Sequence, residues 1–450
     1  MVKIGLEIHG YIDTKEKLFC QCKLEHGRKH TSPNVNICPI CTGQPGSKPM
    51  LPNKEAVKRA IQIALILGCE VSTKMPWQRK HYSWPDNPKC YQSTMSGPHS
   101  VPNGINGKFM GIGITECHLE EDPAAWNPET GEIDYNRSGS PLIEIVTDPD
   151  FTSREQVIEW LGNLIAALSY VKAIDRKSGI KADVNISIEG GERIELKNIN
   201  SLRKINDAIE VEVARQEKDL PKVMETRMYD EEHKTTKLMR TKDNAMDYRF
   251  ISDPDLPALE ISEEWIKEIE EALPETPQEK LKKLIEEFNV DEKSADVLTK
   301  KISLVELFEK TVEKIKPELA IPWVTVELLG VANYNKIDVD DMEIDPEHFI
   351  ELLLAIQEGK IIELKAKDIL RKWVPVSISP TEDIKNSATI SSEEVEGYAN
   401  EVMAENEKAV NDYKSGNVSV INFMIGQVMR KSNKRADFKF AKEVLERLLK

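Results

Sequence analysis

The sequence lacks any apolar run approaching the length of about eighteen residues that a membrane-spanning helix needs. It also lacks a secretory signal, since its first residues alternate like a β-strand. Seven cysteines, an odd number in a chain without such a signal, argue against a disulfide framework. No internal repeat or low-complexity tract is present. We therefore expect a cytoplasmic protein with no membrane contact.

The chain has 450 residues, enough for two or three domains with cores of their own. Its 40% of hydrophobic and 31% of charged residues are typical of a soluble globular protein. The net charge of −16 does not exclude nucleic acid as a partner, because an average can hide a local basic patch.

A basic patch is present in the last thirty residues, where eight lysines and arginines stand against three acidic residues. Four of these basic residues are candidates for contact with nucleic-acid phosphates: Arg430, Lys431, Lys434 and Arg435. A basic helical face that merely meets water fits the same composition. The patch therefore predicts contact with nucleic acid, and binding measurements distinguish this from a solvated face.

Residues 181–201 alternate apolar and polar side chains on both sides of Gly190 and Gly191, which predicts a β-hairpin. A three-residue loop with Gly191 in the left-handed conformation places all the aliphatic residues on one face. On the other face the facing pairs are then Asp183 with Lys197, Asn185 with Glu195, and Ser187 with Arg193. This polar face is a candidate site, although a solvated charged face would have the same pattern.

Two further strands carry polar residues that such a face could share. Residues 2–12 alternate so that Glu7 and His9 project to the same side, a weak signal by itself. Residues 112–122 end in Glu120, Glu121 and Asp122, and three adjacent carboxylates repel one another unless a cation or water relieves them. Oxygen ligands favour magnesium over zinc. Alternation alone leaves open whether Glu120 or Glu121 faces the metal.

Four cysteines have the spacing of a zinc site, as Cys-x-Cys followed by Cys-x-x-Cys. They are Cys20, Cys22, Cys38 and Cys41. A reactive dithiol pair is the alternative, but redox chemistry does not need four thiols. We expect a closed structural zinc knuckle over residues 20–41. The remaining cysteines, which are Cys69, Cys90 and Cys117, are interpreted as small buried apolar residues.

Basic and aromatic residues are concentrated at residues 77–92, where Pro85 and Pro88 predict an irregular loop. Arginine and lysine pair with phosphate, and tryptophan and tyrosine stack on bases. Arg79 and Lys80 are therefore candidates for binding a nucleotide, unless the loop is simply packed by its own aromatics.

Helices are expected at residues 54–67, at about 153–171 and at about 202–218, and a strand at 141–146. Beyond residue 262 strand signals nearly vanish and helical patterns rich in lysine and glutamate follow. We therefore predict a first domain over residues 1–262, a helical domain over 263–385 and a small helical tail over 386–450.

Short motifs occur along the whole chain, at residues 5–9, 17–20, 79–92, 118–122, 136–146, 183–185, 195–201, 247–250, 253–256 and 425–429. Taken together, in this order and spacing, these motifs resemble the B subunits of the tRNA-dependent amidotransferases. The resemblance extends over the whole chain, and its specificity lies in the order and spacing of the motifs.

The resemblance implies an α+β fold, with an N-terminal glutamine-synthetase-like cradle and an antiparallel sheet, followed by a helical domain and a tRNA-contacting tail. It implies that ATP phosphorylates the side-chain carboxylate of Glu-tRNA(Gln) or Asp-tRNA(Asn), and that ammonia then displaces phosphate to give the amide. The implied partners are a glutaminase, which is the A subunit of a heterotrimer, its small C subunit and the tRNA. The implied cofactors are ATP, Mg²⁺ and structural Zn²⁺.

The site residues that the resemblance implies lie on separate strands. The magnesium ligands would be Glu7, His9, Glu120, Glu121, Asp183, Asn185 and Asp243, with Glu195 in the same catalytic set. Phosphate, ATP or the substrate carboxylate would be held by Arg79, Lys80, Lys197 and Arg249.

Several positions depart from the family pattern. Lys181 stands where arginine is usual and loses the bidentate geometry of a guanidinium. Asp243 stands where the family has a longer glutamate. The loop also differs from the family's at Ser83, Trp84, Asn87 and Cys90. The family's glutamate-specific sister protein has an extra domain for which this chain has no room. A non-catalytic, zinc-containing tRNA-binding module is the alternative from another functional class.

Overall fold

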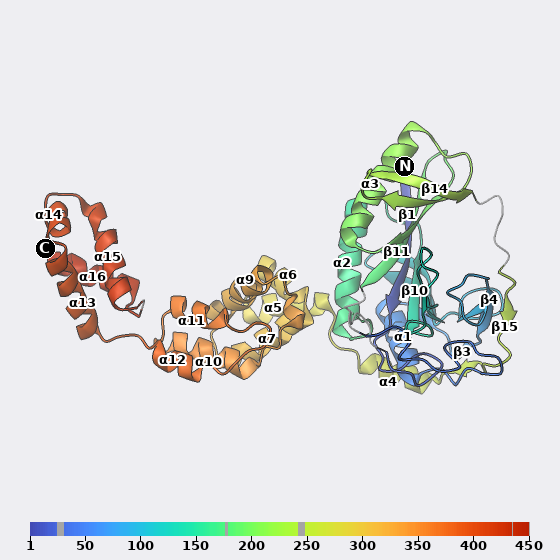
Figure 1. Cartoon of the computed structure of the whole chain (residues 1–450), viewed down its shortest axis with the longest axis horizontal. Helices are drawn as coiled ribbons and strands as arrows, with labels where there is room; N and C mark the ends of the chain where they lie inside the picture. Colours follow the sequence, from blue (N-terminus) through green and yellow to red (C-terminus); the bar gives the residue numbers. More distant parts are fainter. Residues whose placement is uncertain (25–30, 176–178, 242–247, 434, 450) are drawn as a thin grey trace. The chain divides into compact units, whose positions relative to one another are not determined.

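The computed structural model describes residues 1–24, 31–175, 179–241, 248–433 and 435–449 (Figure 1). The chain divides into two compact units, Met1–Thr276 and Pro277–Lys450, which are described one at a time. Among the helices of the described residues, none has both the length and the apolar character needed to cross a membrane.

A mixed sheet organises the first unit, and within the described residues it contains twelve strands. Its main path runs in the order β14-β13-β12-β11-β1-β10-β7-β5-β4-β15, and β6 pairs with both β7 and β2. The strands on the main path are β1 (Val2–Tyr11), β4 (Gln78–His81), β5 (Tyr91–Thr94), β7 (Ile112–Glu121), β10 (Pro141–Thr147), β11 (Ile180–Ile188), β12 (Ile194–Ile199), β13 (Glu225–Asp230), β14 (Thr235–Thr241) and β15 (Ile251–Ser252). The others are β2 (Glu70–Val71) and β6 (Gly104–Phe109).

The prediction of a purely antiparallel sheet is wrong at one pair, because β12 and β13 run parallel. The helix α3 (Leu202–Lys218) connects them and carries the chain back before β13 begins, as a parallel pair requires. Two short antiparallel pairs lie outside the sheet: β3 (Lys74–Met75) with β16 (Leu259–Glu260), and β8 (Ala125–Trp126) with β9 (Ile133–Asp134).

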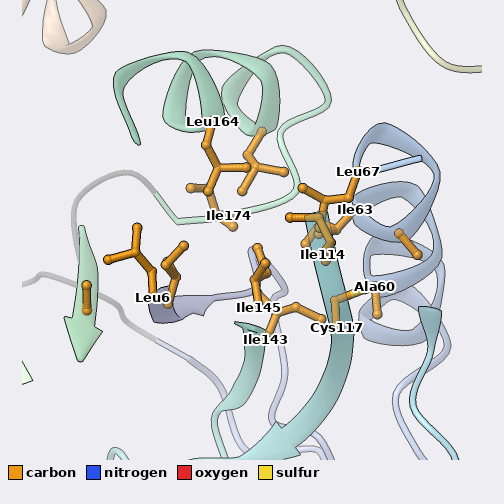
Figure 2. Packing of buried hydrophobic residues seen from close by; sticks show 14 of the residues in the cluster. Leu6, Ala60, Ile63, Leu67, Ile114, Cys117, Ile143, Ile145, Leu164 and Ile174 are labelled. Atoms are coloured by element: carbon orange, nitrogen blue, oxygen red, sulfur yellow. The ribbon is translucent and has the colours of Figure 1, made fainter. Parts of the chain in front are cut away.

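Helices cover the apolar face of the sheet. α1 (Lys54–Ile66), α2 (Arg154–Tyr170) and α3 confirm the three helices expected from the sequence. Asn53, Ser153 and Ser201 cap them by accepting backbone N–H bonds in the first turn. Figure 2 shows the resulting packing of aliphatic side chains from α1 and α2 against strand residues. Its labelled members include Ala60 and Ile63 of α1, Leu164 of α2, Leu6 of β1, Ile114 of β7 and Ile145 of β10.

The hairpin of β11 and β12 has the predicted register, with Asn185 opposite Glu195. Its turn differs from the prediction, because Gly190 and not Gly191 has a positive φ, of 90°. The Gly191 N–H donates to the carbonyl of Ile188, which closes a tight turn whose third residue is Gly190. The connection is longer than three residues because Glu192 N–H bonds to Pro221 O instead of continuing the ladder.

The prediction of an irregular loop over residues 77–92 is wrong at both of its ends. Residues 78–81 form β4 and residues 91–94 form β5, and the two strands pair antiparallel. The prolines at 85 and 88 lie between the strands, where no ladder bond is needed, so they interrupt the segment without preventing the pairing.

The first unit extends beyond the predicted boundary near Ser262 because it includes α4 (Glu263–Glu271). Trp265 and Ile266 pack against the core of this unit, and Ile269 is part of it. The ammonium of Lys54 on α1 lies 5.5 Å from the Trp265 ring centroid. The change in composition at residue 262 therefore follows the last strand, β16, but does not mark the end of the compact unit.

The second unit is helical throughout its described residues. Its elements are α5 (Pro277–Phe288), α6 (Glu292–Thr299), α7 (Ile302–Val312), α8 (Pro317–Pro322), a π-helix η1 (Trp323–Leu328), α9 (Leu329–Tyr334), η2 (Val339–Asp341), α10 (Pro346–Gln357), α11 (Glu363–Leu370), α12 (Thr381–Asn386), α13 (Ser392–Glu405), α14 (Glu407–Lys414), η3 (Val418–Val420), α15 (Ile421–Lys431) and α16 (Phe438–Leu449). The last helices share an apolar cluster that includes Val395, Ile425 and Leu445. That a separate tail domain begins near residue 386 stays a prediction.

Candidate active site

The face of the sheet opposite the helices carries charged residues on five adjacent strands. Alternation on each strand sends aliphatic side chains to the core and the residues between them to this other face. We call this set the polar floor. It consists of Glu7, His9, Glu116, His118, Glu120, Glu144, Asp183, Asn185, Glu195 and Lys197.

Strand register aligns these residues into cross-strand rows. His9 is opposite Glu144, and Glu144 is in turn opposite His118 on β7. Glu7 is opposite Asp183 on the other neighbour of β1. Because directly opposed side chains in a sheet are close enough to interact, the rows bring charges from separate parts of the sequence together.

The first cluster on the polar floor contains His9, Glu120 and Glu144, with one ligand atom of each within 4.8 Å of the others. His9 Nε2 lies 3.3 Å from Glu144 Oε2, and His118 Nε2 lies 3.4 Å from the same oxygen. On its other side, His118 Nδ1 lies 3.1 Å from Glu116 Oε1. Glu144 is therefore shared between two imidazoles.

Charge compensation dominates the titration of this cluster. Burial by itself lowers the pKa of His9, but a hydrogen bond to Glu144 and the charges of Glu144, Glu120 and Asp183 raise it to about 9. Burial raises the pKa of Glu144, yet the neighbouring His118 and His9 hold it well below its usual range. Without a metal ion, imidazolium groups therefore balance the carboxylates at neutral pH.

The second cluster contains Glu7, Asp183 and Glu195, again with ligand atoms within 4.8 Å of one another. Lys197 forms ion pairs with both Asp183 and Glu195. Burial lowers the pKa of Lys197, but these two carboxylates raise it above the ordinary lysine value. The ammonium thus neutralises part of the negative charge that the strands place together.

An orphaned oxygen beside the second cluster fits a cation. Asn185 Nδ2 donates to Glu7 Oε1 at 3.0 Å. Asn185 Oδ1 is buried and has no hydrogen-bond partner among the described residues. A buried carbonyl oxygen needs a partner, and an amide oxygen beside three carboxylates is the kind of donor that Mg²⁺ prefers. The first cluster, with one imidazole, also suits a divalent cation but less selectively.

Glu121 lies outside both clusters, although it was predicted as a possible magnesium ligand. Its Oε1 accepts the Ser93 N–H at 2.9 Å and forms an ion pair with Lys89. Alternation along β7 turns Glu121 to the face opposite Glu120. The structure therefore brings Glu120, and not Glu121, to His9.

The predicted phosphate-binding residues have partners on the chain itself. Arg79 on β4 pairs with Asp253 at 3.0 Å and Asp255 at 2.6 Å, and its guanidinium lies 4.1 Å from the Tyr91 ring centroid. Lys80 Nζ lies 4.9 Å from the centroid of Tyr248. Next to Tyr248 in the sequence, the backbone oxygen of Arg249 lies 2.8 Å from Nδ1 of His81, the last residue of β4. These contacts join β4 to residues 248–255, and β5 connects β4 to the Glu120 strand.

The four cysteines of the predicted zinc knuckle come together, with sulfur atoms within 4.8 Å of one another. Cys38 and Cys41 Sγ are 3.9 Å apart, close to the edge of about 3.8 Å in a tetrahedron with zinc–sulfur bonds of about 2.3 Å. The hydrogen bond between Cys20 and Cys41 lowers the pKa of Cys41, which the nearby Lys17 ammonium also lowers, and raises that of Cys20. The residues fit zinc. Of the other cysteines, Cys69 and Cys117 are buried as predicted, but Cys90 is exposed.

The basic residues of the tail are not equivalent. Arg430 is exposed near the end of α15. Lys431 pairs with Glu401 at 2.9 Å and Glu405 at 2.7 Å on α13. Arg435 is half-buried, with its Nε 3.4 Å from Ser432 O. Lys434, like Asp243 of the predicted magnesium set, lies outside the described residues.

Sequence reasoning did not name Glu144, His118 or Glu116 as site residues. Each stands on a strand with a readable signal. Glu144 is the charged residue among the aliphatics of β10, and Glu116, His118 and Glu120 alternate along β7. Applying the alternation used for Glu7 and His9 to these strands identifies all three.

Comparison of the sequence with family models identifies the class of protein. Residues 2–267 match the family model of the GatB/GatE catalytic domain, and residues 306–449 match that of the GatB domain. The chain belongs to this GatB family.

Curated relatives match along nearly their whole length. The chain is 42% identical over 470 residues to the aspartyl/glutamyl-tRNA(Asn/Gln) amidotransferase B subunit of Methanocaldococcus jannaschii, covering 100% of this chain and 98% of that protein. It is 41% identical over 466 residues to the protein of the same name from Methanococcus maripaludis strain C6, covering 99% and 98%. The same identity holds over 464 residues for that of Methanopyrus kandleri, covering 100% and 98%.

Proposed function

We propose that this chain is the B subunit of a tRNA-dependent amidotransferase, which converts Glu-tRNA(Gln) or Asp-tRNA(Asn) to the amidated form. Family membership and full-length similarity to subunits of that name support this function. One observation carries the chemistry: two carboxylate clusters, whose members are buried or half-buried, lie on adjacent strands of the polar floor.

The reaction has two steps. The substrate carboxylate attacks the γ-phosphorus of ATP, forming an acyl phosphate and releasing ADP. Ammonia then attacks the acyl carbon and expels inorganic phosphate, which leaves the amide and, after proton loss, a neutral nitrogen. A carboxylate is a poor acyl donor until its oxygen is phosphorylated, so ATP is consumed for each amide formed.

The chain's residues contribute positions and charge. Glu7, Asp183, Glu195 and Asn185 would hold one divalent cation, and His9, Glu120 and Glu144 a second. Bound Mg²⁺ supplies neutralisation of the charge on the phosphoryl oxygens. Lys197 is placed to hold a phosphate or carboxylate oxygen once a cation takes over its carboxylate partners. The ATP phosphates are proposed to bind Arg79, Lys80 and Arg249. Arg79 must then give up its ion pairs with Asp253 and Asp255 to bind a phosphate.

The fold and partners follow the same proposal. We infer that the sheet unit is a glutamine-synthetase-like cradle, with a zinc knuckle over residues 20–41, and that the helical region separates near residue 386. The A and C subunits would supply ammonia and complete a heterotrimeric enzyme in the cytoplasm.

The decisive experiment uses the chain purified with candidate A and C subunits. Labelled Glu-tRNA(Gln) or Asp-tRNA(Asn) is incubated with ATP, Mg²⁺ and ammonium, and both ADP and the amidated aminoacyl-tRNA are measured. Amide formation that requires ATP supports the proposal and identifies the substrate. Tight tRNA binding without ADP or amide favours the non-catalytic zinc module, which leaves the polar floor without a role.

The tail is proposed to contact tRNA through its exposed cations. We expect Arg430→Gln to weaken tRNA binding and to lower the slope of log affinity against log salt by about 1, because one phosphate contact is lost. Lys431→Gln should have less effect, since Lys431 is held by two glutamates. Filter binding at several salt concentrations measures both. A triple variant carries Arg430→Gln, Lys434→Gln and Arg435→Gln. If its slope of log affinity against log salt equals that of the unsubstituted chain, the tRNA contact lies elsewhere.

A further inference from the structure

A buried hydroxyl supports one carboxylate of the second cluster. Thr226 Oγ1 donates to Glu195 Oε2 at 3.1 Å, and both residues are about as buried as the core, at 2% and 5% exposure. Thr226 lies on β13, directly opposite Glu195 on β12 in the parallel pair. The proposed function gives Thr226 no role.

The two oxygens of Glu195 have different partners. Lys197 pairs with Oε1, whereas the Thr226 hydroxyl bonds to Oε2. A dication bound between Asp183 and Glu195 repels the Lys197 ammonium and competes with it for these carboxylates. The bond from Thr226 is on the other oxygen and does not compete. It would therefore still hold Glu195 when a cation binds through Oε1.

The orientation of the hydroxyl is itself supported. Arg240 on β14 lies opposite Thr226, and its Nε points to Thr226 Oγ1 at 3.5 Å, a long contact. The positive guanidinium of Arg240 attracts the lone pairs of the Thr226 hydroxyl. The hydroxyl proton of Thr226 therefore points away from Arg240 and toward Glu195. Arg227, the next residue on β13, bonds to Thr236 Oγ1 at 3.0 Å and to Glu225 at 2.6 Å. Arg227 also bonds to the backbone carbonyl of Thr236 at 2.7 Å, so β13 stays joined to β14 when the Thr236 hydroxyl is removed.

We propose that Thr226 is a positioning residue that orients Glu195 for binding a divalent cation together with Glu7 and Asp183. This inference rests on the proposed function, since it concerns the same metal cluster. Groups that bond to a metal ligand fix its rotamer before the metal arrives, and their removal typically weakens metal binding by about 10–100-fold.

The test is Mn²⁺ titration of the full-length, zinc-loaded chain, with free Mn²⁺ measured by electron paramagnetic resonance. The relevant binding is the component that Asp183→Asn removes. We expect Thr226→Val, which keeps the shape and deletes the hydroxyl, to weaken that component by about 10–100-fold. Thr226→Ser, which keeps the hydroxyl, should restore it to within about threefold of the unsubstituted chain, well inside that range.

Thr236→Val is the matched control. Thr236 is buried on the neighbouring strand, and its hydroxyl donates at 2.7 Å to Glu212, a fully buried carboxylate outside the metal clusters. The Thr236→Val variant should have a lower melting temperature than the unsubstituted chain but the same Mn²⁺ affinity. Equal Mn²⁺ affinity of Thr226→Val and the unsubstituted chain, or equal losses in both valine variants, overturns the positioning role alone. Absence of any Asp183-dependent Mn²⁺ binding overturns the proposed metal site, and the positioning role with it.

Discussion

Asp183→Asn should lower ATP-dependent amide formation by more than about a hundredfold while leaving tRNA affinity unchanged. Asp183 is buried, lies opposite Glu7 and pairs with Lys197. Asparagine keeps the side-chain volume but removes the negative charge that the cluster offers to a cation. Loss of a group that only supports a metal ligand costs about 10–100-fold, so loss of a proposed ligand should exceed that range. ADP release and amide formation by the assembled enzyme are the measurements.

Asp230→Asn provides the control on the same sheet. Asp230 pairs with His233 and Lys237 at the turn between β13 and β14. It should therefore leave turnover within about twofold of the unsubstituted enzyme, as substitutions at surface ion pairs usually do. Filter binding of tRNA to each variant separates lost chemistry from lost binding. Turnover by Asp183→Asn at the unsubstituted rate removes Asp183 from the site, and a parallel loss of tRNA affinity assigns it to substrate binding instead.

Removal of zinc should destabilise the first unit strongly. Cys20 and Cys41 are buried beside core residues such as Phe19, so the knuckle is continuous with the packed interior. Without the metal, close thiolates repel one another and the loops that carry them lose their cross-link. We expect Cys41→Ser to cost about 3 kcal/mol or more, which lowers the melting temperature by about 6–12 °C in a unit of this size. Calorimetry and zinc content by atomic absorption are the measurements.

Cys90→Ser is the matched substitution, because Cys90 is exposed and outside the cluster. It should retain one zinc per chain and an unchanged melting temperature. Prolonged chelation of the unsubstituted chain should reproduce the Cys41→Ser value. If Cys41→Ser melts like Cys90→Ser and the purified chain contains no zinc, the four thiols are not a structural metal centre.

Much of the polar floor could be predicted from alternation on single strands. The register of Asn185 with Glu195 follows from the requirement that all aliphatics of the hairpin share one face. The same requirement did not determine the turn, because the bond from Glu192 to Pro221 draws the chain away from the ladder. Glu192 and Pro221 come together because of where α3 ends. The alternation pattern of the strands gives no information about that position.

Which carboxylates share a cation depends on strand order. Glu7 and His9 stand on one strand and face one way, yet they join different clusters, because β11 lies on one side of β1 and β10 on the other. Alternation separates Glu120 from Glu121, but which of the two joins the polar floor depends on which face of β7 packs against the core. The packing of the whole sheet determines which strands are neighbours. A prediction made from each strand separately therefore placed all the ligands in one group and did not distinguish two clusters.

The sequence by itself determined the helices α1 to α3, the cysteine knuckle and the face on which most site residues lie. These features depend on local periodicity and spacing, which short segments encode directly. Only the tertiary structure decided the parallel pairing of β12 with β13, the division of the floor into two clusters and the contact from Thr226 to Glu195. Each of these joins segments far apart in the chain, and their meeting is set by the burial of the whole core.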